Sequence, residues 1–235
     1  NFSTQRYCSL LNLPKTSKKI CFIQKDLSLK NALNNFKKVD VILNLASITD
    51  AEGSLKIRKT IYKNNLGIFN NVLEYCKKNS SKLIHISSTS VYGEQKGLVD
   101  ETCKILKPKS PYAEHKGYGE KSLRQEFHGS DRCAVSLRYF NVYGPKQDYR
   151  RSIPPLMCAL IMKLLKGEQP VIFGNGEKRR DFIYVDDVNR FHELLITNPN
   201  INNNTFNIGY GKNYSVLEVF KVISKLLNSQ IEPVY

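Results

Sequence analysis

The hydrophobic and polar positions of this chain follow two patterns. Short, almost continuous apolar runs, rich in β-branched and aromatic residues, occupy 19–24, 39–46, 82–88 and 133–144. Over 64–79 the apolar residues instead recur every three or four positions. This stripe comprises Leu66, Phe69, Val72, Leu73 and Cys76. The short runs predict buried strands, and the stripe predicts an amphipathic helix.

A second helix is predicted from Ser110 to about Phe127. Ser110 is a good N-cap, and Pro111 is favourable at the first helical position. Glu114 then lies in the first turn, where a negative charge favours the helix dipole. Strands separated by helices of this length predict right-handed crossovers and a parallel sheet that is covered on both faces. We therefore expect an α/β fold, with a doubly wound, Rossmann-like sheet.

In such sheets, ligands bind outside the carboxyl ends of the strands. The segments at these places are "ASITD" after Leu45, "SSTSVYG" after Ile86 and "YFNVYG" after Leu137. Small, hydroxyl-bearing and amide residues gather in all three segments. We expect the chemistry of the protein at this edge of the sheet.

Composition is that of a globular protein, with 41% hydrophobic and 24% charged residues in 235. No apolar run approaches the roughly 20 residues that cross a bilayer, and no charged-then-apolar leader opens the chain. Neither C-x-x-C spacing nor a histidine at metal spacing accompanies the cysteines, so we predict free thiols in a reducing cytoplasm and no metal. The cysteines are Cys8, Cys21, Cys76, Cys103, Cys133 and Cys158.

The net charge of +15 raises the question of a nucleic-acid partner. The lysines are spread along the whole chain, and no basic segment is interleaved with aromatic residues. We therefore predict no nucleic-acid binding. Two interpretations of the charge stay open: a lysine-rich surface produced by compositional bias, or a basic cleft for a phosphorylated small molecule.

Two tyrosines lie four positions before a lysine, and this spacing brings side chains together only on a helix. Tyr92 precedes Gly93 at a strand-to-loop transition, so its pairing with Lys96 is not expected. Tyr112 and Lys116 fall in the first turns of the predicted helix. An ammonium near a phenol lowers its pKa from about 10 and enables it to exchange a proton with a substrate hydroxyl. The spacing alone also fits two solvated surface residues.

Five motifs carry a resemblance to a known family. They are "ISSTSVYG", "SPYAEHK", "LRYFNVYGP", "IFGNGEKRRDFIYVDDV" and "FNIGYGKNYSVLEV". In this order and at these intervals they resemble the extended short-chain dehydrogenases/reductases of the NAD-dependent sugar-nucleotide epimerase/dehydratase family, with members like UDP-glucose 4-epimerase. The resemblance implies an NAD cofactor, a nucleotide-sugar substrate, a cytoplasmic location, a homodimer and no membrane or nucleic-acid partner.

The resemblance also assigns roles to residues. Tyr112, Lys116 and Ser88 match the catalytic set, in which Ser88 bonds the reacting sugar oxygen and Lys116 also bonds the nicotinamide ribose. The positions that would line the cofactor are Asn1, Ser3, Thr4, Asp26, Leu27, Leu45, Ala46, Ser47, Asn65, Lys116 and Tyr139. The positions that would contact the substrate are Ser88, Tyr112, Asn141, Ile153, Val171, Phe173 and Arg180.

Simpler interpretations of some of these residues remain open. Ser88 could cap the turn after its strand, and Leu27 and Leu45 could be core residues. For Arg180, the guanidinium suits a phosphate, and Asn141 matches an amide that contacts the diphosphate.

The resemblance implies a NAD-binding domain over 1–143 and a smaller, mixed substrate lobe over 144–235, with 181–197 returning to the first domain. The family opens with a strand, a glycine-rich phosphate loop and a helix, and we find no counterpart before "NFST". We therefore expect the chain to be incomplete at its N-terminus by about 30 residues, one βαβ opening.

The residues after Ser88 bear on the reaction. Dehydratases of the family carry an Asp-Glu pair there, and decarboxylases keep a glutamate, whereas this chain has Thr89 and Ser90. Because elimination would lack its acid, the sequence favours a UDP-sugar 4-epimerase that acts through a transient 4-keto sugar. A dehydratase, a decarboxylase, a reductase or a non-catalytic nucleotide-binding relative stays an alternative, and the sequence does not identify the sugar or the base.

Overall fold

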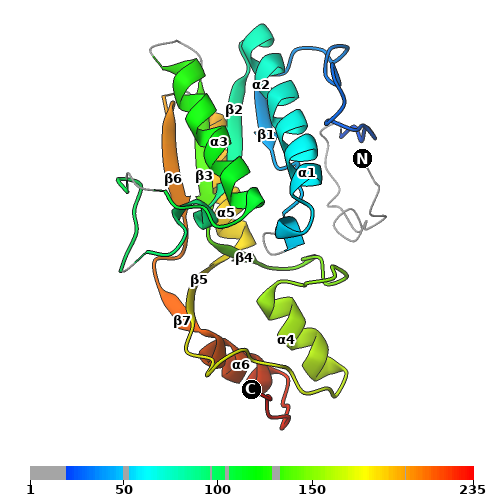
Figure 1. Cartoon of the computed structure of the whole chain (residues 1–235), viewed down its shortest axis with the longest axis vertical. Helices are drawn as coiled ribbons and strands as arrows, with labels where there is room; N and C mark the ends of the chain where they lie inside the picture. The colour runs from blue at the N-terminus through cyan, green and yellow to red at the C-terminus, as the bar shows by residue number, and fades with distance from the viewer. Residues whose placement is uncertain (1–19, 50–52, 96, 104–105, 129–132, 199) are drawn as a thin grey trace. The chain divides into compact units, whose positions relative to one another are not determined.

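A computed structural model of the chain (Figure 1) forms two compact units. The first unit comprises Ile23–Tyr139 and Asn189–Ile208; the second comprises Phe140–Val188 and Gly209–Tyr235, with residues 20–22. The residues described are 20–49, 53–95, 97–103, 106–128, 133–198 and 200–235.

The first unit is built on a four-stranded parallel sheet in the order β1-β2-β3-β6. Its strands are β1 (Val41–Asn44), β2 (Lys82–Ser88), β3 (Ala134–Tyr139) and β6 (Asn204–Ile208). Helices α2 and α3 lie on one face of the sheet, and α5 lies behind it (Figure 1). The doubly wound α/β fold predicted from the sequence is thereby confirmed.

The first unit contains α1 (Arg58–Ile61), α2 (Gly67–Asn79), α3 (Pro111–Phe127) and most of α5 (Val185–Thr197), with the short helical segments η2 (Gly53–Leu55), η3 (Tyr62–Leu66) and η4 (Thr89–Tyr92). The two helices predicted from the sequence, over 64–79 and from Ser110 to about Phe127, correspond to η3 with α2 and to α3. Ser110 caps α3 by accepting a hydrogen bond from the Ala113 N–H (3.2 Å). The predicted N-cap is therefore confirmed.

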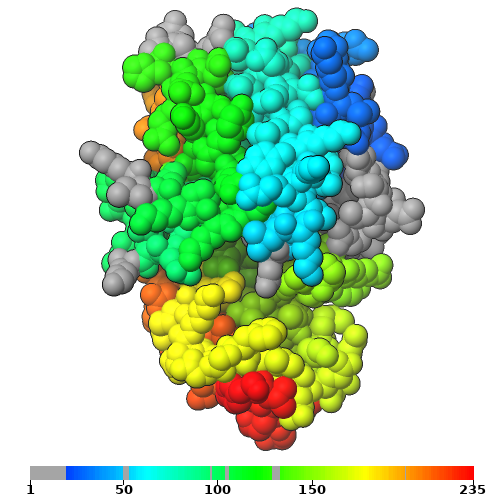
Figure 2. Space-filling model, in the orientation of Figure 1, coloured from blue at the N-terminus to red at the C-terminus, as the bar shows by residue number. Residues whose placement is uncertain are grey.

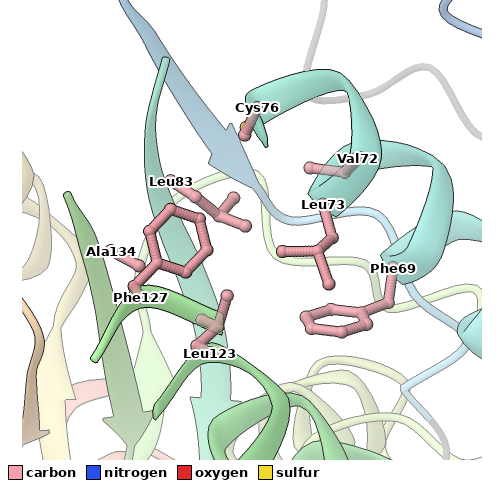
Figure 3. Close-up of a cluster of buried hydrophobic side chains, with 8 residues drawn as sticks. All are labelled: Phe69, Val72, Leu73, Cys76, Leu83, Leu123, Phe127 and Ala134. Atoms are coloured by element: carbon pink, nitrogen blue, oxygen red, sulfur yellow. The ribbon is translucent and has the colours of Figure 1, made fainter. Parts of the chain in front are cut away.

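One apolar cluster joins α2, α3 and the sheet (Figure 3). The cluster comprises Phe69, Val72, Leu73, Cys76, Leu83, Leu123, Phe127 and Ala134. Four of the five stripe residues predicted on α2 are in it, while Leu66 is half-buried in η3. Figure 2 shows the side chains of α2 (cyan) and α3 (green) meeting in one surface on this side of the first unit.

Two sequence predictions need correction. No strand forms over 20–24; Ile20, Phe22 and Ile23 are 54%, 58% and 56% exposed. An apolar run becomes a strand only when a neighbouring strand pairs with its backbone, and no described strand pairs with this one. The run 133–144 divides at Phe140 into β3 and β4, which belong to different sheets.

The second unit contains a mixed sheet in the order β4-β5-β7. Strand β4 (Asn141–Tyr143) is parallel to β5 (Arg179–Tyr184), and β7 (Asn213–Ser215) is antiparallel to β5. Helices α4 (Leu156–Leu165) and α6 (Val216–Leu226) pack with the sheet around a second apolar core. The expected smaller mixed lobe is present.

The compact units divide after Tyr139, and the chain returns to the first unit over Asn189–Ile208. We expected a domain boundary after 143 and a return over 181–197, and that domain division stays a prediction. Within the described residues, no helix is long and apolar enough to cross a membrane.

The N-terminal half of α2 fixes the backbone of a preceding segment. Asn71 donates hydrogen bonds from Nδ2 to the carbonyl oxygens of Leu27 (2.8 Å) and Leu29 (2.7 Å). A Cβ atom on Gly67 would lie 2.8 Å from the Ser28 carbonyl oxygen. The segment at 27–29 therefore approaches α2 so closely that only glycine fits at 67.

Replacing Gly67 by alanine should destabilise the protein. Alanine normally stabilises a helix interior by about 0.5–1 kcal/mol relative to glycine, but the new methyl group must here push the Ser28 backbone away. Gly117 on α3 provides the matched control, because a Cβ atom there would meet no atom within 4 Å. In denaturant titrations we expect G67A to unfold earlier than the parent and G117A later. Equal gains from both substitutions would contradict the close approach at Gly67.

Candidate active site

Lys116 is a buried ammonium between α3 and β2, with 3% of the residue exposed. Its Nζ donates a hydrogen bond to the Ile86 carbonyl oxygen (2.7 Å). Burial lowers the pKa of Lys116 from 10.5 to about 8, because a charged group loses its hydration. The side chain is thus mostly protonated at neutral pH.

Tyr112 lies one turn before Lys116 on the same face of α3, as the spacing predicts. The Lys116 Nζ is 5.6 Å from the centroid of the Tyr112 ring, within cation–π range. Tyr112 is 9% exposed, and its N–H donates a hydrogen bond to the Ser54 Oγ (3.4 Å). A cation and a phenol therefore share a desolvated part of the first unit.

Ser88 ends β2, two residues beyond the carbonyl that binds Lys116. Its Oγ accepts hydrogen bonds from the N–H (3.2 Å) and the Oγ (2.9 Å) of Ser90, so the residue does cap η4. Both contacts use the oxygen as an acceptor, and a hydroxyl retains its own proton to donate. Capping is therefore compatible with a hydrogen bond from Ser88 to a ligand.

Asn65 fixes the loop that follows β1. Its Oδ1 accepts from the Ile48 N–H (2.9 Å), and its Nδ2 donates to the Ile48 carbonyl oxygen (3.1 Å). Asn65 is 1% exposed, whereas Leu45 is 56% exposed and Ala46 is also exposed. This exposure contradicts the core interpretation of Leu45.

The remaining cofactor candidates are distributed along the first unit. Asp26 accepts hydrogen bonds from the N–H (2.9 Å) and the Oγ (2.7 Å) of Ser28, and half-buried Leu27 follows it. Half-buried Ser47 donates to the Ile48 carbonyl oxygen (3.2 Å). Asn1, Ser3 and Thr4 lie outside the described residues.

Tyr139, at the end of β3, forms a hydrogen bond with the Nε2 atom of His192 on α5. Burial raises the pKa of the Tyr139 phenol. No sequence signal identifies His192, since a single histidine on an amphipathic helix resembles any other partly buried side chain. The backbone carbonyl of Tyr139 also accepts a hydrogen bond from Thr89 Oγ1 (3.1 Å).

In the second unit, Asn141 and Arg180 have different surroundings. Asn141 Nδ2 donates to the Asp181 carbonyl oxygen (2.7 Å). Arg180 is exposed on β5, and among the described residues no hydrogen bond or ion pair engages its side chain. Its neighbour Arg179, on the opposite side of the strand, pairs with Glu218 (2.9 Å). Because side chains alternate along a strand, Arg179 points toward its ion-pair partner, whereas Arg180 points to the other side and is available to bind an anion.

The apolar substrate candidates are exposed on the second unit. Ile153, Val171 and Phe173 are 49%, 56% and 91% exposed. Among the described residues, no hydrogen bond or ring contact joins them to Arg180, so the structure does not by itself bring this group together. The sequence also missed Asp181, whose carboxylate accepts the N–H groups of Tyr210 (2.8 Å) and Gly211 (2.7 Å).

Comparison with known proteins identifies the family. The sequence model of the NAD dependent epimerase/dehydratase family matches residues 4–209. The chain belongs to this family. It is 34% identical over 207 residues to a putative UDP-glucose 4-epimerase of Methanocaldococcus jannaschii, with 86% of this chain and 65% of the relative covered.

Solved structures of the family agree with this result. A UDP-N-acetylglucosamine 4-epimerase from Methanobrevibacter ruminantium, in complex with UDP-N-acetylmuramic acid, superposes with a TM-score of 0.85 at 32% identity, covering 91% of this chain and 68% of that one. A UDP-glucuronic acid 4-epimerase from Bacillus cereus, with UDP-glucuronic acid and NAD, gives 0.77 at 33% identity, covering 88% and 64%. The chain thus spans about two thirds of the length of these relatives.

Membership in this family confirms NAD as the cofactor, and the residues of the first unit fit it. Exposed Leu45 and Ala46 lie at the carboxyl end of β1, where parallel sheets bind ligands, and Asn65 holds the loop that follows them. The buried Lys116 ammonium provides a donor for a ribose hydroxyl. These side chains would hold the cofactor on the first unit.

Two buried histidines, His85 and His115, lie near Lys116. Phe69 packs edge-on against the rings of His85 (5.1 Å) and His115 (6.3 Å). Among the described residues, both ring nitrogens of His85 and the Nδ1 of His115 have no hydrogen-bond partner. Burial, reinforced by the Lys116 charge, lowers the pKa of His115 to about 3 and that of His85 well below 6.5. Both rings therefore stay neutral in the folded protein.

These histidines should make the protein acid-sensitive. In the unfolded chain a histidine binds a proton below about pH 6.5, whereas folded His115 does so only near pH 3. The contribution of His115 to stability is therefore complete above about pH 6.5 and falls as pH drops, by about 3 kcal/mol between pH 7 and 4, and His85 acts in the same direction.

The measurement is the free energy of unfolding from denaturant titrations between pH 4 and 7. We expect H115L to lose less unfolding free energy than the parent between pH 7 and 4, by the amount that His115 contributes. Exposed His128, which follows the same helix, provides the control H128Q, which should leave the slope unchanged. A slope in H115L equal to that of the parent would contradict the assignment.

Proposed function

We propose that the protein is an NAD-dependent epimerase of a nucleotide sugar, acting as a UDP-sugar 4-epimerase. The main support is the buried, protonated Lys116 one helical turn from Tyr112 and bonded to a carbonyl two residues before Ser88. These are the three residues that match the catalytic set of the family. The family relatives named UDP-sugar 4-epimerases point to the same reaction class.

Each of the three side chains has a role in the proposed mechanism. The Lys116 ammonium favours the phenolate form of Tyr112, and this phenolate accepts the proton of the sugar C4 hydroxyl to become a neutral phenol. Ser88 donates a hydrogen bond to the same sugar oxygen and shares its developing charge. NAD, when bound, supplies the two-electron chemistry at C4. The 4-keto sugar then turns its other face, and Tyr112 returns the proton that it accepted to the C4 oxygen as the ketone is reduced.

Epimerisation is favoured over elimination by the residues after Ser88. Thr89 Oγ1 donates to the Tyr139 carbonyl oxygen (3.1 Å), and Ser90 Oγ donates to Ser88 (2.9 Å). Neither side chain is a carboxylic acid, so neither supplies the acid that a dehydratase uses at these positions. A reductase or decarboxylase of the same family is the second candidate. An assay with and without added NADH distinguishes a reductase, which needs it, from an epimerase, which does not.

The nucleotide is proposed to bind to residues of the second unit. Exposed Arg180 would pair with a phosphate, Asn141 would contact the diphosphate, and the 91%-exposed Phe173 would stack on the base with Ile153 and Val171 nearby. A homodimer and a cytoplasmic location are part of the same proposal, carried over from the family.

Tyr112→Phe should abolish turnover while leaving binding intact, because only the ionisable proton acceptor is removed. The protein is incubated with NAD and either UDP-glucose or UDP-N-acetylglucosamine, and the C4 epimer is measured by NMR. We expect a rate loss of at least about 10³-fold with an unchanged Kd for the nucleotide sugar.

Tyr118→Phe is the matched control, since Tyr118 is on the same helix and 47% exposed. It should retain the parent rate. A Y112F protein that keeps turning over, or a parent that binds NAD and yields no C4 epimer, would rule out the proposal.

Turnover should also decline as the pH rises through about 8, where the Lys116 ammonium loses its proton. A neutral amine no longer favours the phenolate of Tyr112, so kcat should show an alkaline limb near that pH. The measurement is kcat at saturating substrate from pH 6 to 10, with the fold monitored by circular dichroism. A flat profile up to pH 10 in a folded protein would contradict a charged Lys116 in the mechanism.

A further inference from the structure

Glu120 is a fully buried carboxylate on α3, one turn beyond Lys116 and 1% exposed. Arg138 on β3 binds it with two hydrogen bonds, from Nε to Oε1 (2.9 Å) and from Nη2 to Oε2 (2.6 Å). Ser87 Oγ donates a third to Oε1 (2.5 Å). The exposed Arg124 approaches the carboxylate only to 3.9 Å. A desolvated charge is therefore satisfied in a fixed geometry by two neighbouring strands.

These contacts relate α3 to β2 residue by residue. The consecutive residues Ile86 and Ser87 bind Lys116 (2.7 Å) and Glu120 (2.5 Å), which are one helical turn apart. Sliding α3 by one residue moves each side chain about 1.5 Å along the axis and about 100° around it. Such a slide would break both hydrogen bonds, so the network permits one register of α3 on the sheet.

Arg138 extends the same network to the segment after Ser88. Its Cα atom is the register partner of Ser87. Its Nη1 donates to the Tyr92 hydroxyl (2.8 Å), which in turn bonds Asn207 Oδ1 (2.8 Å) on β6. Tyr92 is the last residue of η4, and Ser88 is the cap at the start of that turn. One guanidinium thus links the helix that carries Tyr112 to the turn that begins at Ser88.

We propose that Glu120 and Arg138 are positioning residues, which hold Tyr112 and Ser88 in the geometry that proton transfer requires. The proposal rests on the proposed function of Tyr112 and Ser88. Glu120 fixes the rotation and depth of α3, and Arg138 fixes the end of η4 against the same strands. Neither residue touches the reacting atoms in this scheme, so their removal should alter the chemical step and leave ligand affinity unchanged.

Stability and positioning can be separated for this pair. Removing one partner leaves a buried charge without compensation, which destabilises a fold strongly, whereas replacing both partners with apolar side chains of similar size is often neutral. The informative variant is therefore the double substitution E120L/R138M. It removes the directional bonds to Ser87 and Tyr92 while keeping the volume of the core.

The experiment compares the parent, E120L/R138M and two further variants in the whole chain. In the double variant we expect a thermal midpoint close to that of the parent, a fall in kcat of at least tenfold and a KM for the UDP-sugar within twofold. A crystal structure of the variant should show a changed distance between the Tyr112 hydroxyl and Ser88 Oγ. S87A removes one bond to Glu120 and no charge, and a kcat loss of several-fold is expected.

Glu126→Gln is the matched control, because it removes the half-exposed ion pair between Glu126 on α3 and Lys77 on α2 (2.8 Å). It should leave kcat and the Tyr112 position unchanged. A folded double variant with parental kcat and parental geometry would overturn the proposal, and so would equal losses in E126Q. If the double variant does not fold, parental kcat and Tyr112 geometry in S87A overturn it instead. A failure of this proposal can be told apart from a failure of the proposed function. The first is seen in the crystallographic distance between Tyr112 and Ser88, which does not depend on turnover, and the second is seen in the turnover of Y112F.

Discussion

Polar groups buried between α3 and the sheet of the first unit have no water to bind, so they depend on partners within the protein. Lys116 finds one in a backbone carbonyl of β2, and Glu120 finds its partners in Arg138 and Ser87. Apolar packing alone tolerates small slides of a helix, because contacts of similar energy replace one another. Directional bonds to buried charges tolerate far less. The position of Tyr112 follows from this constraint.

The same interface also contains groups that lack partners among the described residues. His85 and His115 stay neutral because burial and the nearby Lys116 charge oppose their protonation. Lys116 is therefore a cation beside two neutral rings in a desolvated setting, where a charge acts on a neighbouring phenol more strongly than it would in water. The cost of this arrangement is stability at acid pH, and its benefit would be a proton acceptor with a defined electrostatic environment.

The second unit uses similar physics for another purpose. The Asp181 carboxylate accepts hydrogen bonds from the backbone N–H groups of Tyr210 and Gly211, and its backbone carbonyl accepts one from Asn141. Arg179 is occupied by Glu218, which leaves Arg180, on the other side of β5, as the arginine that can meet an anion. Two adjacent, identical residues thus differ in their partners because strand alternation points them in opposite directions.

The sequence by itself determined the elements whose signal is local and periodic. The stripe at 64–79, the run at 82–88 and the Ser110–Pro111 start of α3 all matched the structure, because hydrophobic period and capping are properties of neighbouring residues. The five motifs in their order were sufficient to predict the family and the NAD cofactor. The Tyr112–Lys116 pairing followed from helix geometry, although its catalytic role stays a proposal.

Only the tertiary structure decided what depends on partners far away in the chain. The run at 20–24 forms no strand because a strand needs a neighbour, which no local pattern reveals. Leu45 is exposed, His192 reaches Tyr139, and Glu120 meets Arg138, none of which could be inferred from the surrounding residues. In each case burial and hydrogen bonding are set by elements brought together through folding, so the chemistry of a side chain is fixed by its three-dimensional neighbours.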